Sequence, residues 1–168
     1  MPASPSASAS PCLLVVDTAT EVVHLALVTQ GQVRVRAVAG GAQASAATLP
    51  QMQALLAEAG LAWSQLDAIG FGQGPGAFTG LRTACAITQG LALALDRPVL
   101  ALDTLMAVAE SARRRQPALA QAAADEPALW VLQDARMQEV YAAPYRHTPQ
   151  GGWRAEASAE LWPIAHAR

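Results

Sequence analysis

The stretch GQGPGAFTGLRTACAITQGLALAL, residues 72–95, decides how the fold of this chain is interpreted. Four glycines and a proline fall within its first nine residues, and an apolar segment with helical spacing follows directly. Glycine before a helix is common in phosphate-binding loops, because it lets backbone N–H groups approach an anion closely. The stretch therefore predicts either a phosphate-binding loop or a tight connection between a strand and a helix.

Two well-known phosphate-binding sequences do not fit this stretch. A P-loop requires a lysine after its last glycine, and the chain contains no lysine. A dinucleotide-binding fingerprint is matched in part by Gly72, Gly74 and Ala77. The acidic residue expected about 20 residues later would be Asp96, which lies before Pro98 at the end of a helix rather than of a strand.

A structural interpretation accounts for the loop without a ligand. Gly74, Gly76 and Gly80 would permit close approach of the backbone, and Pro75 would make the turn rigid. Thr79 would cap a helix that begins at Gly80. We therefore predict a structural loop formed by these five residues and no cofactor-binding site.

The segments on either side of the loop alternate between strand and helix patterns. Strands are predicted at 13–16, 21–28, 33–38, 66–72 and 99–103, and helices at 45–59, 79–95 and 104–114. Pro50 lies inside the first helix, so the regular part of that helix could begin near Leu49. The resulting order, βββαβαβα, predicts a three-stranded meander followed by parallel crossovers.

A second meander follows this unit, with strands predicted at 128–133, at 139–146 and around 151–157. The chain is therefore predicted to have four parts: a disordered tail at 1–11, a first lobe at 12–115, a linker at 116–127 and a partial second lobe at 128–168. The second lobe would lack the helices that follow the meander in the first, which would leave strand edges and an apolar face uncovered.

Composition limits the class of protein. Hydrophobic residues make up 52% of the chain and the formal net charge is −2, which disfavours a broad nucleic-acid surface. The two cysteines have no paired spacing, so neither a disulfide framework nor a cysteine metal site is expected. No apolar run reaches the roughly 18 residues of a membrane span, and the N-terminus lacks a signal-peptide pattern. These features predict a cytoplasmic protein without membrane contact.

Four segments together resemble the TsaB family, which belongs to the superfamily of actin-like ATPases, sugar kinases and Hsp70. They are LLVVDTAT (13–20), GPGAFTGLR (74–82), VLALDTLMAVA (99–109) and DARMQEVY (134–141). The resemblance extends over residues 13–165, and GPGAFTGLR is its most specific part. It implies an α/β, actin-like (RNase H-like) fold with a βββαβαβα lobe followed by an incomplete second lobe.

The resemblance also implies a function. TsaB proteins are non-catalytic paralogues of TsaD, the subunit that transfers a threonylcarbamoyl group to tRNA adenosine (t6A37). This chain would therefore be a scaffold subunit rather than an enzyme, and it would bind and stabilise a TsaD-like subunit. A TsaE-like ATPase would complete the assembly, tRNA would be reached only through the complex, and the isolated chain would form a homodimer.

The residues themselves give little support for catalysis. Asp17 ends the first strand, but the turn at 18–20 has no glycine that would let a phosphate approach. The segment 43–48, which corresponds to the paired-histidine metal motif of TsaD, contains no metal ligand. The histidines, which show no ligand spacing, are His24, His147 and His166. We expect no catalytic residue, metal or cofactor. The alternative is an active nucleotide-dependent kinase or ATPase, or an RNase H-like nuclease, in which Asp103 would be the obvious companion of Asp17.

The two helices at 49–59 and 80–95 are apolar or small on nearly all sides, although one sheet can cover only one side of each. In the TsaB family these helices form the dimer surface, which the resemblance extends to this chain. The predicted partner interface comprises Leu49, Met52, Leu55, Leu56, Gly80, Ala84, Ile87, Gly90 and Leu91.

Overall fold

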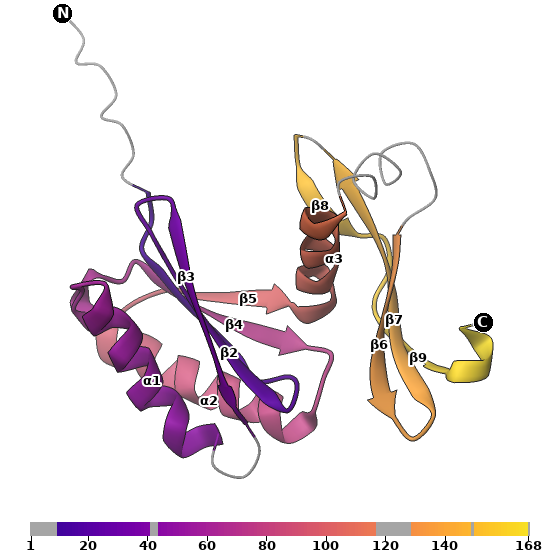
Figure 1. The fold of residues 1–168 in the computed structure, drawn as a ribbon, viewed down its shortest axis with the longest axis horizontal. Helices are drawn as coiled ribbons and strands as arrows, with labels where there is room; N and C mark the ends of the chain where they lie inside the picture. Colours follow the sequence, from indigo (N-terminus) through magenta and orange to yellow (C-terminus); the bar gives the residue numbers. More distant parts are fainter. Residues whose placement is uncertain (1–9, 41–43, 117–128, 149, 168) are drawn as a thin grey trace, which may run out of the picture.

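The computed structural model describes residues 10–40, 44–116, 129–148 and 150–167, and its strands form two separate sheets (Figure 1). The first sheet has the order β3-β2-β1-β4-β5. Its strands are β1 (Leu13–Asp17), β2 (Val22–Thr29), β3 (Gln32–Ala39), β4 (Ala68–Gly74) and β5 (Val99–Asp103). β1, β2 and β3 pair antiparallel, whereas β4 pairs parallel with both β1 and β5. The element order matches the prediction.

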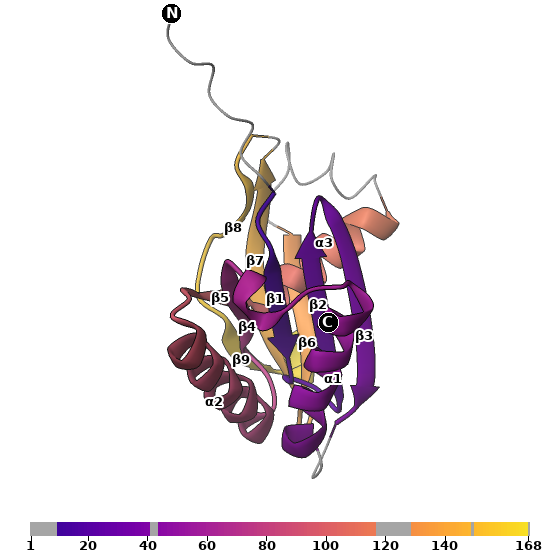
Figure 2. The same cartoon turned by 90° about the vertical axis from the view of Figure 1, so that its left-hand side faces the viewer.

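Helices α1 (Ala44–Glu58) and α2 (Phe78–Leu95) cover one face of this sheet (Figure 2). Every second residue of β1 and β2 points into the contact, as expected for strands that bury one face. The core at this contact includes Leu14, Val16, Leu25, Leu27, Met52, Leu55, Leu56, Ile69 and Ala84. α1 continues through Pro50 without interruption and ends before Gly60, whose φ of +68° is the left-handed value that glycine favours after a helix. A short 3-10 turn, η2 (Trp63–Gln65), then leads to β4.

The start of α2 differs from the prediction. The helix begins at Phe78, its N-cap residue is Ala77, and no side chain caps it. The backbone N–H of Ala77 donates instead to the carbonyl of Ala19, at 2.8 Å. The prediction that Thr79 caps this helix was therefore wrong, because a neighbouring loop supplies the acceptor. The end of α2 agrees with the prediction, since Asp96 follows it with a φ of +52°.

The second sheet contains β6 (Leu129–Arg136), β7 (Glu139–Thr148), β8 (Gly152–Ala155) and β9 (Glu160–Pro163), followed by the 3-10 turn η3 (Ile164–His166). β7 pairs with β6 along one edge, and along the other it pairs with β8 and then with β9. The strand predicted around 151–157 corresponds to β8, whereas β9, which pairs with the same edge of β7, was not predicted.

Helix α3 (Thr104–Arg115) lies between the end of β5 and the second sheet (Figure 1). Its buried residues pack against that sheet in a core of Leu105, Ala109, Val131, Ala143 and Tyr145. The sequence placed this helix with the first lobe, at 12–115, whereas its apolar side is covered by the second sheet. α3 thus joins the two lobes.

Glu110 on α3 strengthens this junction. Its carboxylate accepts hydrogen bonds from Arg113 Nε at 2.7 Å, from Arg114 Nε at 2.7 Å and from Trp153 Nε1 at 2.8 Å. These bonds, first that from Arg113, hold the pKa of Glu110 far below its usual value. Because Trp153 belongs to β8, the ionised carboxylate links the helix to the outer edge of the second sheet.

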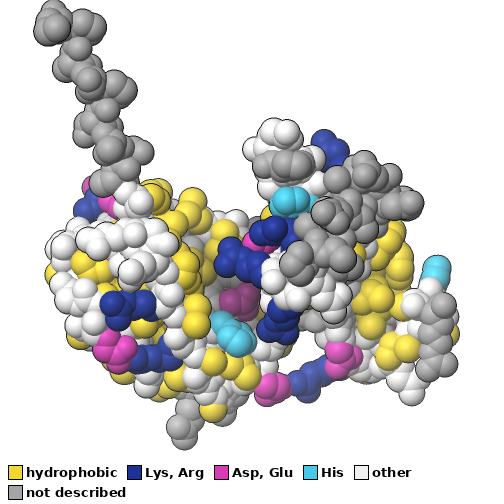
Figure 3. All heavy atoms as spheres, turned by 45° about the horizontal axis from the view of Figure 1, so that its top comes forward, with side chains coloured by type: hydrophobic (Ala, Val, Ile, Leu, Met, Phe, Trp, Pro, Cys, Tyr) yellow, Lys and Arg dark blue, Asp and Glu magenta, His cyan; other side chains and the backbone are white. Residues whose placement is uncertain are grey.

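Large hydrophobic side chains remain exposed on both lobes (Figure 3). On the face of the first sheet opposite α1 and α2, Val35 is 77% exposed and Leu102 39%. On the second sheet, Trp130 is 48% exposed although its ring lies 4.7 Å from that of Trp162. Among the residues that the structure describes, no helix combines the length and apolar character needed to cross a membrane.

Candidate functional site

The glycine loop between β4 and α2 packs tightly against the turn between β1 and β2. A Cβ atom on Gly80 would lie 1.8 Å from the carbonyl oxygen of Thr18, and one on Gly76 would lie 2.6 Å from Ala19 Cβ. The hydroxyl of Thr18 donates to the carbonyl of Gly80 at 2.5 Å. Within residues 72–80 a positive φ occurs at Gly74 alone, so Gly76 and Gly80 are required by close packing. This geometry supports the structural interpretation of the loop.

Asp17, the acidic residue at the end of β1, uses both carboxylate oxygens in structural hydrogen bonds. Oδ1 accepts from the backbone N–H of Ala19 at 2.7 Å, which fixes the turn after β1. Oδ2 accepts from Thr104 Oγ1 at 3.1 Å, which connects the first sheet to the start of α3. The carboxylate also lies against Gly72, where an added Cβ would be 2.1 Å from Oδ2. Asp17 therefore acts as a turn and junction residue.

Asp103, the other acidic candidate, is engaged in the same way. Its Oδ1 accepts from the backbone N–H of Met106 at 3.0 Å and caps α3, while its Oδ2 accepts from the hydroxyl of Tyr145 at 2.7 Å. Tyr145 is only 1% exposed. Burial, with a further effect of the Asp103 carboxylate, raises the pKa of Tyr145 well above its usual value. The pair thus fixes the helix to the second sheet.

No group of three or more potential metal ligands occurs among the described residues. The three histidines lie on different strands or turns. His24 is exposed on β2, the His147 ring meets the Trp153 ring edge-on at 4.9 Å, and the His166 ring stacks on Trp162 at 5.2 Å. The structure does not bring them together.

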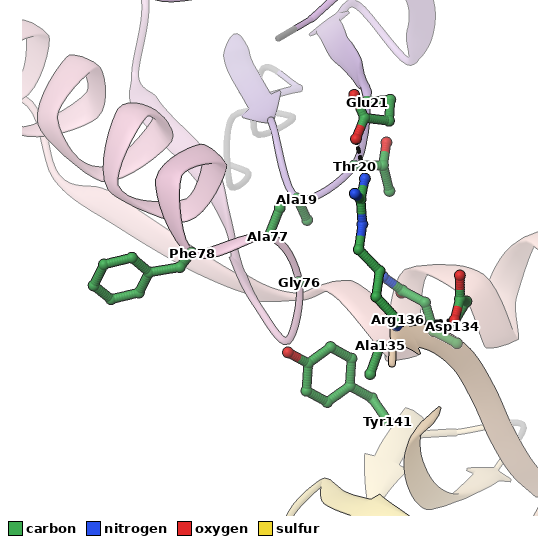
Figure 4. Close-up of a pocket in the computed structure, with 11 residues that line it drawn as sticks. Ala19, Thr20, Glu21, Gly76, Ala77, Phe78, Asp134, Ala135, Arg136 and Tyr141 are labelled. Atoms are coloured by element: carbon green, nitrogen blue, oxygen red, sulfur yellow. Dashed lines mark hydrogen bonds and ion pairs between the residues drawn. The ribbon is translucent and has the colours of Figure 1, made fainter. Parts of the chain in front are cut away.

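A pocket of about 430 Å³ lies between the two lobes (Figure 4). Three segments line it: the turn at 19–21, the start of α2 at 76–78 and the end of β6 at 133–136, with Tyr141 beside them. Glu21 and Arg136 form an ion pair across the pocket. Its charged lining residues are Glu21, Asp134 and Arg136, so the lining carries a net negative charge that disfavours a phosphate group.

The turn between β6 and β7 has an unusual backbone. Arg136, Met137 and Gln138 have φ values of +66°, +53° and +63°, although none of them is glycine or asparagine. The backbone N–H of Arg136 donates to Asp134 Oδ1 at 2.9 Å, and the Met137 side chain is 91% exposed. The sequence predicted a turn here but not these left-handed residues, because the usual composition signal of glycine or asparagine is missing.

The outward side of α2, which we call the α2 outer face, consists of Phe78, Arg82, Ala86, Gly90 and Leu93. Phe78 and Leu93 are 67% and 87% exposed, and the Arg82 guanidinium lies 4.1 Å from the centre of the Phe78 ring. A Cβ on Gly90 would meet nothing within 4 Å. From Phe78 to Leu93 the face is about 22 Å long, given the rise of a helix. Phe78 and Leu93 therefore lie at the two ends of this face, with Arg82 and the small residues Ala86 and Gly90 between them.

The structure separates the predicted interface residues into two groups. Met52, Leu55, Leu56 and Ala84 are at most 1% exposed and belong to the core of the first lobe, and Gly80 is pressed against Thr18. Ile87 and Leu91 are partly buried against the same core. Leu49, at 42%, and Gly90 are exposed and remain available to a partner. The exposure of Phe78, Ala86 and Leu93 was not predicted, because a sequence that is apolar or small on both sides of a helix does not show which side is buried.

Comparison with known proteins identifies the family. The family model described as "TsaD: tRNA N6-adenosine threonylcarbamoyltransferase" matches residues 25–157. The tRNA threonylcarbamoyladenosine biosynthesis protein TsaB of Escherichia coli is 37% identical over 158 residues, which are 93% of this chain and 65% of that protein. The TsaB protein of Haemophilus influenzae is 38% identical over 130 residues, which are 77% of this chain and 51% of that protein. The chain thus spans between half and two thirds of the length of these curated relatives.

A solved structure agrees with this assignment. YeaZ from Pseudomonas aeruginosa superposes with a TM-score of 0.79 at 40% identity, over 92% of this chain and 68% of that one. The predicted actin-like α/β fold class is confirmed by this similarity and by the TsaD family match. The resemblance drawn from the four sequence motifs is confirmed as well, and the chain belongs to the TsaB family.

Proposed function

We propose that this chain is a non-catalytic subunit in the formation of t6A37 in tRNA, where it binds and stabilises a TsaD-like catalytic subunit. The observation that carries the proposal is the α2 outer face, which exposes the large apolar side chains of Phe78 and Leu93 on a helix that is otherwise packed into the core. Exposed apolar patches on folded domains commonly mark contacts with other proteins. The names of the relatives, which are biosynthesis proteins for threonylcarbamoyladenosine in tRNA, support the pathway.

The shape of the α2 outer face suits a second helix. Ala86 and Gly90 lack bulk at its centre, so a partner helix can approach closely, while Phe78 and Leu93 can insert beside it. α1 lies next to α2 on the same side of the sheet (Figure 2), and its Leu49 adds a further exposed apolar side chain. Large apolar anchors around a closely packed centre are typical of the residues that dominate binding.

The acidic residues support a role without catalysis. Asp17 and Asp103, which the competing nuclease or kinase hypothesis would use to hold metal ions, each have both oxygens in hydrogen bonds to the protein. These four bonds give both carboxylates a structural role, because they fix the turn after β1 and attach the start of α3 to both sheets. The acidic lining of the pocket between the lobes is also unfavourable for nucleotide phosphates.

The α2 outer face also determines which complexes this chain would form. A homodimer of the isolated chain and the complex with a TsaD-like subunit would both use the α2 outer face, so the two would exclude each other. We further propose that a TsaE-like ATPase joins the complex and that tRNA is bound only by the complete assembly.

Ala86→Arg tests the proposal, with Ala107→Arg on the exposed side of α3 as the matched control. A charge buried without a partner at an interface costs about 3–5 kcal/mol. Ala86→Arg should therefore weaken binding of the TsaD-family subunit from the same genome by about a hundredfold or more, measured by isothermal titration. It should also reduce t6A formation in a reconstituted reaction. Ala107→Arg should change neither.

Circular dichroism should show that both variants remain folded, because both alanines are exposed. Binding by a folded Ala86→Arg variant that equals binding by the wild type would contradict the assignment of this interface. A wild-type chain that neither binds the TsaD-family subunit nor supports t6A formation would contradict the proposed function itself.

A further inference from the structure

The hairpin between β6 and β7 has a backbone that its side chains do not favour. Arg136 pairs with Glu139, which leaves Met137 and Gln138 as the two residues of the turn. A two-residue hairpin with positive φ at both positions normally contains asparagine or glycine. Here three consecutive residues with side chains, Arg136, Met137 and Gln138, adopt left-handed φ values. Such values are disfavoured because Cβ crowds the neighbouring backbone.

Contacts on three sides hold the hairpin in this conformation. The Asp134 carboxylate accepts from the backbone N–H of Arg136 at 2.9 Å, and the Arg136 guanidinium pairs with Glu21 on the first lobe (Figure 4). On the remaining side, the carbonyl of Gln138 accepts from the backbone N–H of Ile164 at 2.9 Å. The position of the turn is therefore determined by the second sheet, by η3 and by the first lobe together.

Met137 lies at the tip of this hairpin, and its side chain is not buried in the isolated chain. Its side chain is 91% exposed, more than any other large hydrophobic side chain that the structure describes. Backbone strain of this kind tends to occur where the position of a residue matters for function. Methionine is unbranched and polarisable, so it adapts well to irregular apolar pockets.

The hairpin lies close to the proposed partner surface. Arg136 and Phe78 line the same pocket between the lobes, and Phe78 is the first residue of the α2 outer face. In Figure 4 the Phe78 ring points out of this pocket, on the side opposite Arg136. A partner that extends along α2 beyond Phe78 would reach the pocket whose other side is lined by Arg136 of the hairpin.

We propose that the β6–β7 hairpin tip is a second contact with the partner that binds the α2 outer face, and that Met137 inserts into an apolar pocket of this partner. The inference rests on the proposed function. The partner at this contact is a protein rather than RNA, because the carboxylates of Glu21, Asp134 and Glu139 outnumber the single guanidinium of Arg136 beside the turn, and the net negative charge would repel phosphates. The Glu21–Arg136 ion pair positions the tip.

Three variants of the full chain separate the side chain of Met137 from the strain of the turn. Met137→Ala removes the side chain, and Met137→Gly removes both the side chain and the local strain. Gln138→Gly removes the strain and the polar side chain at the adjacent position and leaves Met137 in place. The binding of each to the TsaD-family subunit is measured by isothermal titration, and its thermal unfolding by circular dichroism.

Met137→Ala and Met137→Gly should each bind the subunit at least about tenfold more weakly, as expected for an interface anchor. Gln138→Gly should bind within about threefold of the wild type. Both glycine variants should raise the melting temperature by about 2–4 °C, because glycine adopts left-handed φ without crowding. Weaker binding together with higher stability in Met137→Gly is a result that a purely structural role of Met137 does not produce.

Ala86→Arg on the α2 outer face distinguishes this inference from the function on which it rests. If Ala86→Arg abolishes binding while both Met137 variants bind like the wild type, the hairpin contact is refuted and the proposed function stands. Equal loss of binding in Gln138→Gly and Met137→Gly would also refute the inference, because the turn conformation and not the side chain would then carry the effect. If the wild type fails to bind, the proposed function falls and this inference falls with it.

Discussion

Gly80 and Gly90 lie on the same helix, and replacing each with alanine should change stability in opposite directions. At Gly80 the new Cβ would lie 1.8 Å from the carbonyl oxygen of Thr18, whereas at Gly90 it would meet nothing within 4 Å. Contacts of a Cβ below 3.0 Å essentially do not occur, so the first turn of α2 must move by at least about 1 Å in Gly80→Ala.

The expected energies follow from what this movement disturbs. Overpacking of this kind costs about 1–3 kcal/mol. The hydrogen bonds from Thr18 Oγ1 to Gly80 O, at 2.5 Å, and from Ala77 N to Ala19 O, at 2.8 Å, each contribute about 1 kcal/mol. Alanine recovers up to about 1 kcal/mol through its helix propensity. Gly80→Ala should therefore lower the free energy of unfolding by about 2–4 kcal/mol, while Gly90→Ala should raise it by about 0.5–1 kcal/mol.

Urea unfolding followed by circular dichroism at neutral pH measures both changes under the same conditions. The wild type is the reference for each variant, and the m-value should stay constant if only stability changes. Equal stability of Gly80→Ala and the wild type would show that α2 and the β1–β2 turn are not in direct backbone contact in solution, and the structural interpretation of the glycine loop would then be refuted.

Three other predictions concern buried or hydrogen-bonded polar groups. Tyr145→Phe should lower the free energy of unfolding by about 1–2 kcal/mol in urea, because the Asp103 carboxylate loses a buried donor; an unchanged value would argue against this bond. The pKa of Glu110 is lower in the folded than in the unfolded state, so its hydrogen bonds stabilise the protein above about pH 4.5 and this contribution is lost as the pH falls further. The difference in melting temperature between the wild type and Glu110→Gln should accordingly shrink from pH 7 to pH 3, and a constant difference would contradict the ionised network. Asp17→Asn should lower the free energy of unfolding by about 1–2 kcal/mol, because Asp17 loses part of its hydrogen bonding. Titration of the wild type or of this variant with ATP and magnesium should show no micromolar binding site. A micromolar site in the wild type that is lost in Asp17→Asn would favour the nucleotide-dependent alternative.

The order of strands and helices could be predicted because each pattern of side chains is local. The continuous apolar run of β1, the alternation of β3, and the glycine and aspartate that follow α1 and α2 specify element type within a few residues. The family could be recognised for a related reason. GPGAFTGLR combines a glycine loop with the first turn of a helix, and its glycines are required wherever that turn packs against the β1–β2 turn.

The predicted element boundaries that were wrong depend on contacts between segments that are distant in the sequence. Thr79 has the composition of a helix cap, but the acceptor for the start of α2 is the carbonyl of Ala19, about 60 residues earlier in the chain. The strand β9 was not predicted, because the sequence does not show that β7 pairs with a second short strand beyond β8 along the same edge.

The sequence by itself determined most of the elements, their order and the glycine loop between β4 and α2, because these depend on short-range periodicity and on backbone conformation. The family was recognised from the resemblance of the four motifs. The tertiary structure alone decided which residues of α2 are available to a partner. Ala84 and Ala86 are two positions apart and chemically identical, yet one is fully buried and the other exposed. Both sides of the helix are apolar or small, so the hydrophobic effect favours burial of either, and the choice is made by the sheet against which the helix packs.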